Sequence, residues 1–132
     1  MPARGLSARD FQEAADLRGA LRRFQQRTAQ VLPRHGLTSA QYQLLLVVKT
    51  AANGEGEEFA AIADRLGIAR STATELVRRV EEAGLVERRL HPHDRRALLV
   101  ALTTEGAARL EAAVRALRGD RERLISILQA LV

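Results

Sequence analysis

Cysteine and tryptophan are absent from this 132-residue sequence, and only one tyrosine and three phenylalanines occur. Without cysteine, disulfide bonds, thiolate metal sites and thiol-based redox sensing are excluded, because each of them needs the sulfur atom. No segment approaches the ~18 uninterrupted apolar residues of a membrane span, and no charged and then apolar leader precedes a cleavage site. We therefore expect a soluble, cytoplasmic protein with no membrane partner. Its length suits one small domain that carries an assembly element.

Basic residues outnumber acidic residues by 21 to 16, which gives a formal net charge of +5. This excess fits a nucleic-acid partner, because lysine and arginine neutralise phosphates. The excess is spread along the chain: residues 1–58 carry eight basic and six acidic groups, residues 59–102 eight and six, and residues 103–132 five and four. No block is a basic tail, so the local placement of the charges must decide what they bind.

The first third of the chain predicts two helices. Apolar residues recur at helical spacing over residues 10–32, which is typical of a long amphipathic helix that stops at Pro33. Thr38 or Ser39 can then cap a second helix that ends near residue 50. The second helix is apolar enough to be central in the fold.

Residues 59–83 carry a helix-turn-helix pattern. A short helix over residues 59–66 is stopped by Gly67, and a second helix follows from about residue 70 to residue 83. One face of the second helix is apolar and belongs to the core. The opposite face carries hydroxyls and long hydrogen-bonding side chains, which are the types that contact base edges and phosphates. The candidate DNA-binding residues of this helix are Arg70, Ser71, Thr72, Thr74 and Arg78.

A hairpin is predicted after this helix. Residues 85–89 and 97–102 suit strands, and residues 91–94, His-Pro-His-Asp, supply turn chemistry between them. A hairpin beside a recognition helix can place arginine in the minor groove, where the negative potential attracts it. The candidate arginines of the hairpin are Arg88, Arg95 and Arg96.

The end of the chain predicts two more helices. Thr103 or Thr104 opens the first, which ends at Gly119, and Asp120 caps the second. The last helix is too apolar to face solvent, so we expect it to pair with a second copy of the chain together with the first helix. The candidate dimerisation residues are Phe11, Leu17, Leu21, Leu124, Ile127, Leu128 and Leu131.

The segment from Gly84 to Gly106 resembles a known family signature. It reads Gly-Leu-Val-Glu-Arg-Arg-Leu-His-Pro-His-Asp-Arg-Arg-Ala-Leu-Leu-Val-Ala-Leu-Thr-Thr-Glu-Gly, and the wing signature of the MarR family has the form Gly-Leu-Val, a turn, Asp-x-Arg, then Leu-Thr-x-x-Gly. The resemblance implies a homodimer paired through its terminal helices, and often a small aromatic or apolar ligand that weakens DNA binding. It also implies that Asp94 orients Arg96, the minor-groove residue. Asp94 precedes Arg96 by two residues in a tight turn, so we expect its carboxylate to hold the Arg96 guanidinium by charge-assisted hydrogen bonds.

The same resemblance implies a ligand cleft between the dimerisation helices and the DNA-binding lobe. The candidate residues of this cleft are Phe24, His35, Tyr42 and Leu45, although they fit a plain core equally well. The chain departs from the family at two places. Ala69 stands where a capping hydroxyl is common, so that Ser71 caps instead or the helix start is less fixed, and the C-terminal helices are short.

Other chemistry has little support in the sequence. The chain has three histidines, His35, His91 and His93. A structural zinc site needs about four ligands, so we expect no metal and no cofactor. The hydroxyls of the second helix of the motif have no neighbouring histidine base. Glu55, Glu57 and Glu58 form an acidic loop without a general-acid counterpart, so we expect no enzyme.

These observations predict an α+β, mostly helical fold. Residues 37–102 form a winged helix-turn-helix, and residues 1–36 and 103–132 supply the dimerisation helices. The expected function is a sequence-specific transcription regulator: a homodimeric repressor that binds double-stranded DNA at a pseudo-palindromic operator and is released by a small ligand. Two alternatives stay open, an architectural DNA-binding protein without sequence preference and a winged-helix protein-interaction module.

Overall fold

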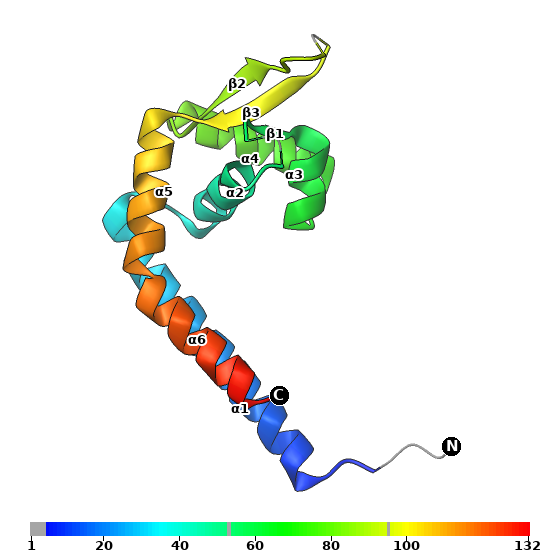
Figure 1. Ribbon diagram of the computed structural model, residues 1–132, viewed down its shortest axis with the longest axis vertical. Coiled ribbons are helices and arrows are strands. Elements are labelled where there is room, and N and C mark those ends of the chain that lie inside the picture. Colours follow the sequence, from blue (N-terminus) through cyan, green and yellow to red (C-terminus); the bar gives the residue numbers. More distant parts are fainter. Residues whose placement is uncertain (1–4, 53, 95) are drawn as a thin grey trace.

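The computed structural model describes residues 5–52, 54–94 and 96–132. These residues form a lobe of helices and strands and a long arm of two helices that leads away from it (Figure 1). The elements, in chain order, are α1 (Ala8–Val31), the 3-10 helix η1 (Leu32–His35), α2 (Ser39–Lys49), β1 (Glu57–Glu58), α3 (Phe59–Leu66), α4 (Arg70–Glu82), β2 (Val86–Leu90), β3 (Leu98–Leu102), α5 (Thr104–Ala116) and α6 (Arg118–Ala130).

The lobe confirms the predicted helix-turn-helix followed by a hairpin. Strands β2 and β3 pair antiparallel, with Val86 opposite Leu102 and Leu90 opposite Leu98. Each strand begins one residue later than the sequence predicts. The hairpin projects beyond the helices as a wing (Figure 1). The fold is therefore the expected α+β winged helix-turn-helix.

A third strand was not predicted. The acidic segment that reads as a loop contains β1, which pairs antiparallel with β3 and gives the sheet order β1-β3-β2. Gly56, the residue before β1, lies so close to β3 that an added Cβ would be 2.7 Å from the Val100 carbonyl oxygen. Two paired residues are too few to produce a periodic pattern in the sequence. The free edge of β3, rather than any local preference of Glu57 and Glu58, makes this strand.

Helix ends follow the local chemistry in the lobe. Thr38 caps α2 in a capping box with Gln41: the Gln41 backbone N–H donates to Thr38 Oγ1 at 3.1 Å, and the Thr38 N–H donates to Gln41 Oε1 at 2.9 Å. Gly67 ends α3 at a φ of 67°, in the left-handed region that favours glycine. This conformation turns the chain from α3 into α4.

The boundary between α5 and α6 differs from the prediction. Only Leu117 separates the two helices, at φ −92° and ψ 0°, and α6 begins at Arg118, so that Gly119 lies inside it. Asp120 therefore does not cap α6. Its carboxylate instead forms an ion pair with Arg27 of α1, with 3.3 Å between Arg27 Nε and Asp120 Oδ2. Because Leu117 is buried, tertiary packing sets this boundary more than glycine does.

One continuous apolar core fills the lobe. It joins α2, α3, α4, the sheet and the lobe-facing side of α5, so the wing and α4 share a single support. Its fully buried side chains include Leu44, Leu45, Ile62, Val77, Val80, Leu85, Val86 and Val100.

A polar clip joins the start of the wing to α5. Thr103 Oγ1 donates to the Gly84 carbonyl at 2.6 Å and accepts from the Gly106 N–H at 3.0 Å. The Thr103 N–H donates to the Leu85 carbonyl at 3.1 Å. The clip holds the residue before β2 against the first turn of α5, so the wing is tied to the helix that leads into the arm.

The arm consists of α1 and α6, which pack side by side and run antiparallel (Figure 1). Among the described residues of α6 none is buried, and in α1 only Ala20 and Val31 are. No described helix is long and apolar enough to cross a bilayer. The arm therefore leaves much of its own apolar surface uncovered.

Candidate nucleic-acid interface

Helix α4 presents its polar face to solvent. Ala73, Val77 and Val80 are buried, and the candidate residues on the opposite side are exposed as predicted: Arg70, Ser71, Thr72, Thr74 and Arg78. Of the two outcomes that the sequence left open for this helix start, the cap by Ser71 does not form: α4 begins after Ala69 without a side-chain cap. The Thr74 hydroxyl donates to the Arg70 carbonyl at 2.9 Å. Because this bond uses the hydroxyl hydrogen, Thr74 Oγ1 can still accept a hydrogen bond.

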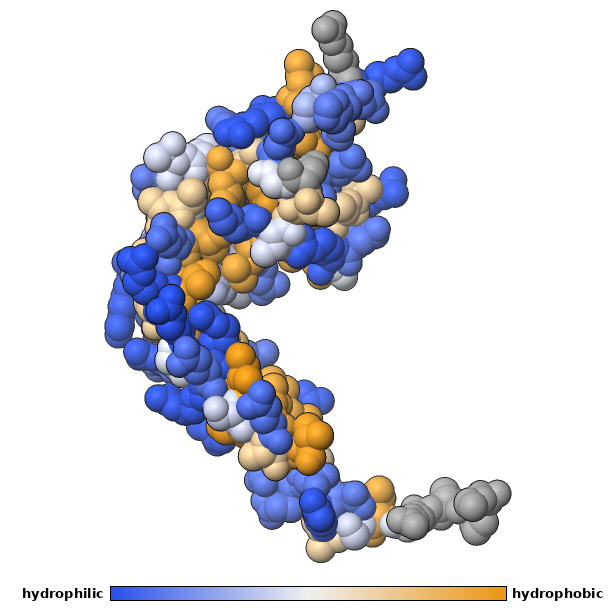
Figure 2. Space-filling view, viewed as in Figure 1, coloured by the Kyte–Doolittle hydropathy of each residue, from blue (hydrophilic) through white to orange (hydrophobic). Residues whose placement is uncertain are grey.

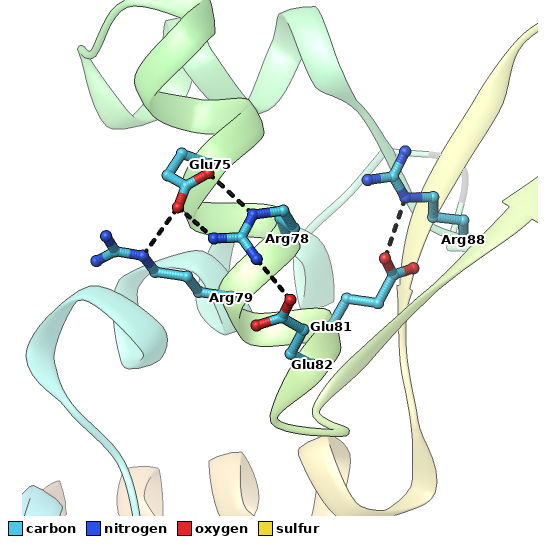
Figure 3. Close-up of polar contacts among 6 residues, drawn as sticks. All are labelled: Glu75, Arg78, Arg79, Glu81, Glu82 and Arg88. Atoms are coloured by element: carbon cyan, nitrogen blue, oxygen red, sulfur yellow. Dashed lines mark hydrogen bonds and ion pairs between the residues drawn. The ribbon is translucent and has the colours of Figure 1, made fainter.

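Arg78 is enclosed by two carboxylates of its own helix (Figure 3). Its Nε donates to Glu75 at 3.0 Å, its Nη2 donates to the same carboxylate, and its Nη1 donates to Glu82. Arg79 Nε also donates to Glu75, at 3.1 Å. The Arg78 and Arg79 guanidiniums hold the pKa of the Glu75 carboxyl at about 2, so this group stays ionised at neutral pH.

Arg88 of the wing contacts both α3 and α4, although its side chain stays 38% exposed. Its Nε donates to Glu81 of α4 at 3.3 Å (Figure 3), and its guanidinium lies over the Phe59 ring at 5.2 Å from the centroid. A cation over an aromatic face is a favourable contact. Arg88 therefore ties the wing to the helix-turn-helix, a role that was not predicted for it.

Glu75 belongs to the polar face that was predicted to contact DNA, but the contacts of the glutamates with the arginines of this surface were not predicted. Glu75, Arg78, Arg79 and Glu82 stand three and four residues apart, which is the spacing at which helical side chains meet. That spacing was visible in the sequence. The contact between Arg88 and Glu81 was not, because it joins two elements.

The tip of the wing is a turn in which Asp94 acts on the backbone. Asp94 Oδ1 accepts the Arg96 backbone N–H at 3.0 Å, and the Ala97 N–H donates to the Asp94 carbonyl at 3.1 Å. The expected contact was between the carboxylate and the Arg96 guanidinium. The structure corrects this: the Asp94 carboxylate closes an Asx-type turn, which fixes the backbone of Arg96 and leaves this residue exposed. Arg95, the other predicted tip arginine, lies outside the described residues.

The predicted ligand residues lie in different surroundings. Phe24 lines a groove between α1 and α6 with Leu124 and Ile127. Leu45 is fully buried in the core of the lobe, in agreement with the plain-core alternative that the sequence left open for it. Tyr42 packs against the same core and is partly buried, and this burial raises the pKa of its hydroxyl.

His35 lies partly buried in η1, whereas His91 and His93 lie in the turn of the wing. Within the described part of the chain, no three acidic or histidine side chains gather closely enough to hold a metal ion.

The predicted dimerisation residues share one arm. Phe11 is 64% exposed and Leu17 38% exposed. The others are partly buried: Leu21, Leu124, Ile127, Leu128 and Leu131. Apolar surface runs along the arm in Figure 2. The single chain leaves this surface in contact with water.

Known proteins are similar to this chain in sequence. Residues 35–97 match the MarR family. The chain is 32% identical over 108 residues to a regulatory protein assigned to the hcr operon of Thauera aromatica, covering 80% of this chain and 62% of that protein. It is 33% identical over 76 residues to the HTH-type transcriptional repressor YetL of Bacillus subtilis, covering 58% of this chain and 45% of that protein. The chain thus spans less than two thirds of the length of either relative.

Two solved structures are similar as well. CouR from Rhodococcus jostii RHA1, bound to p-coumaroyl-CoA, is 32% identical with a TM-score of 0.65, over 73% of this chain and 66% of that one. A variant of MepR from S. aureus, bound to an oligodeoxyribonucleotide, is 26% identical with a TM-score of 0.67, over 83% of this chain and 78% of that one. On its helix-turn-helix, its wing and these likenesses, the chain belongs to the MarR family of winged helix-turn-helix regulators.

Proposed function

We propose that this protein is a sequence-specific DNA-binding transcription repressor. The observation that carries the proposal is the pairing of two exposed surfaces on one support: the polar face of α4 and the arginine-bearing tip of the wing. A helix of this kind fits the major groove, and an arginine on a neighbouring hairpin fits the adjacent minor groove. The DNA-bound MepR variant adds support through its similar fold.

The proposal includes a homodimer and a pseudo-palindromic operator. A two-fold dimer presents two copies of α4 to one face of DNA, one for each half-site. We further propose that a small aromatic or apolar ligand releases the DNA, and that the protein works in the cytoplasm without catalytic activity. The ligand-bound state of CouR supports the first of these points, and the regulators among the relatives support the last.

Selection of bound sequences from a random DNA pool tests the proposal. We expect inverted repeats whose half-site centres lie about 10 base pairs apart. A pool that gains affinity without any enriched sequence would favour an architectural protein, and a protein that binds no DNA would favour a protein-interaction module.

The same selection tests the role of α4. Arg78→Ala should weaken the selected site by about 1–3 kcal/mol and relax the preference at one position if Arg78 reads a guanine. Arg115→Ala is the matched control, because Arg115 is also an exposed helical arginine in an ion pair but lies on α5. An equal loss on every sequence would instead assign Arg78 to a phosphate.

A further inference from the structure

Helix α4 carries no net charge, although it is the helix proposed to enter the major groove. Its three arginines, Arg70, Arg78 and Arg79, are balanced by its three glutamates, Glu75, Glu81 and Glu82. An uncharged helix cannot gain affinity for phosphates from its overall charge. The way in which individual arginines are held therefore decides what this helix binds.

The arginines of the DNA-facing surface fall into two groups. In the described part of the chain, the guanidiniums of Arg70 and Arg96 form no ion pair. Arg78 and Arg79 are held by Glu75, and Arg88 is held by Glu81 (Figure 3). The first group can meet any phosphate at once. The second group must first give up a carboxylate.

We propose that Glu75 is a specificity-determining residue that withholds Arg78 and Arg79 from DNA until the correct base sequence offers better acceptors. This inference rests on the proposed DNA-binding function. Glu75 suits the role because one carboxylate serves two arginines of the next turn.

The geometry at Arg78 makes the exchange selective. All three guanidinium nitrogens are occupied, two by Glu75 and one by Glu82. To bind Arg78, a phosphate of a random DNA sequence must displace the Glu75 carboxylate, which is also negatively charged and already accepts two hydrogen bonds from this guanidinium. A guanine presents O6 and N7 together and can replace that contact with two parallel hydrogen bonds. The Glu75 charge also repels the DNA backbone wherever the exchange is not made.

The exchange is possible because the pairs are open to water. The side chains of Arg78 and Glu75 are 48% and 46% exposed, and ion pairs of this exposure contribute little to stability. Removing Glu75 should therefore leave the fold intact while it releases two guanidiniums.

The test compares three variants on two DNA duplexes, the site selected from a random pool and a scrambled duplex of equal length and composition. Glu75→Gln should raise affinity for the scrambled duplex by about 3- to 10-fold and change affinity for the selected site less than about twofold. Its salt dependence on the scrambled duplex should steepen by a log–log slope of about 1 to 2.

Two matched variants isolate the cause. Glu82→Gln removes the same charge from the same helix but leaves both Glu75 contacts, so its effect should be smaller. Glu122→Gln removes the same charge from an exposed position on α6 and should leave the ratio between the two duplexes unchanged. Circular dichroism of each variant checks the fold.

Two results would overturn the inference. One is an unchanged ratio of affinities in Glu75→Gln. The other is a loss at the selected site with no gain on scrambled DNA, which would mean that Glu75 itself accepts a hydrogen bond from a cytosine. A wild-type protein that prefers neither duplex would instead overturn the proposed function, so the two failures are distinct.

Discussion

Gly106 illustrates how a single missing methyl group positions the wing. An added Cβ at this residue would lie 1.9 Å from the Leu85 carbonyl oxygen, far inside any allowed contact. The same carbonyl accepts the Thr103 N–H, so it cannot move away without breaking the clip. The glycine of the Leu-Thr-x-x-Gly motif is therefore needed for close packing of the first turn of α5 against the residue before β2.

Gly106→Ala should destabilise the protein by at least about 2 kcal/mol, because the backbone must shift to relieve the contact. Gly119→Ala is the control. Gly119 is also helical, and an added Cβ there meets nothing within 4 Å, so alanine should be neutral or stabilise by up to ~1 kcal/mol. Urea denaturation of both variants measures the difference. Equal free energies of unfolding would show that the clip can relax.

At the scale of elements, the wing depends on the Asp94 turn. The carboxylate orders the backbone of Arg96, so the charge of Asp94 and its hydrogen bond can be separated by substitution. Asp94→Ala removes both, whereas Asp94→Asn removes the charge and keeps an oxygen acceptor. The two variants have the same net charge, and bulk electrostatics predicts equal DNA affinity for them.

We expect Asp94→Ala to bind the selected DNA site about 3- to 10-fold more weakly than Asp94→Asn, because a disordered tip loses more entropy on entering the groove.

Arg96→Ala should lower the slope of log affinity against log salt concentration by about 1 and weaken binding most at sites with narrow A·T-rich flanks. Titrations at several salt concentrations measure both effects. If the alanine and asparagine variants bind alike, Asp94 acts through its charge alone.

The sequence predicted those elements whose signal is local. Thr38 and Gly67 mark helix ends by their own chemistry, and the apolar face of α4 follows from its period. β1 could not be predicted, because its two residues are ordered by the edge of β3. The α5–α6 boundary was misplaced, because buried Leu117 and the ion pair of Asp120 with α1 override the glycine signal.

The candidate site was predicted in outline for a similar reason. Which residues of α4 point outward depends only on helical geometry, and the exposed set agrees with it. What each guanidinium touches depends on neighbours in space. Arg88 meets Glu81 and Phe59 across elements, and Asp94 finds a backbone amide instead of a side chain.

At the scale of the molecule, the arm of α1 and α6 has more apolar surface than one chain can bury. Phe11 and Ile125 are 64% and 46% exposed on it. Exposed apolar residues along one face are typical of a surface that another protein covers. In a dimer with a two-fold axis, the same apolar residues would be covered on both copies, and the two lobes would be held at a fixed separation.

Phe11→Ser should therefore weaken the proposed dimer. Each copy of Phe11 would lose roughly 1–2 kcal/mol of burial. A two-fold interface contains two copies of Phe11 and loses twice this free energy, which corresponds to a dissociation constant ~30- to 1000-fold higher.

Leu90→Ser is the matched control, because Leu90 is 65% exposed but lies on the wing. Sedimentation over a range of concentrations measures both variants. We expect Phe11→Ser to dissociate at concentrations where wild type and Leu90→Ser stay dimeric, and to lose affinity for a two-half-site duplex while keeping its weaker affinity for one half-site. A wild-type protein that sediments as a monomer, or a Phe11→Ser dimer as stable as wild type, would show that the arm is covered in another way.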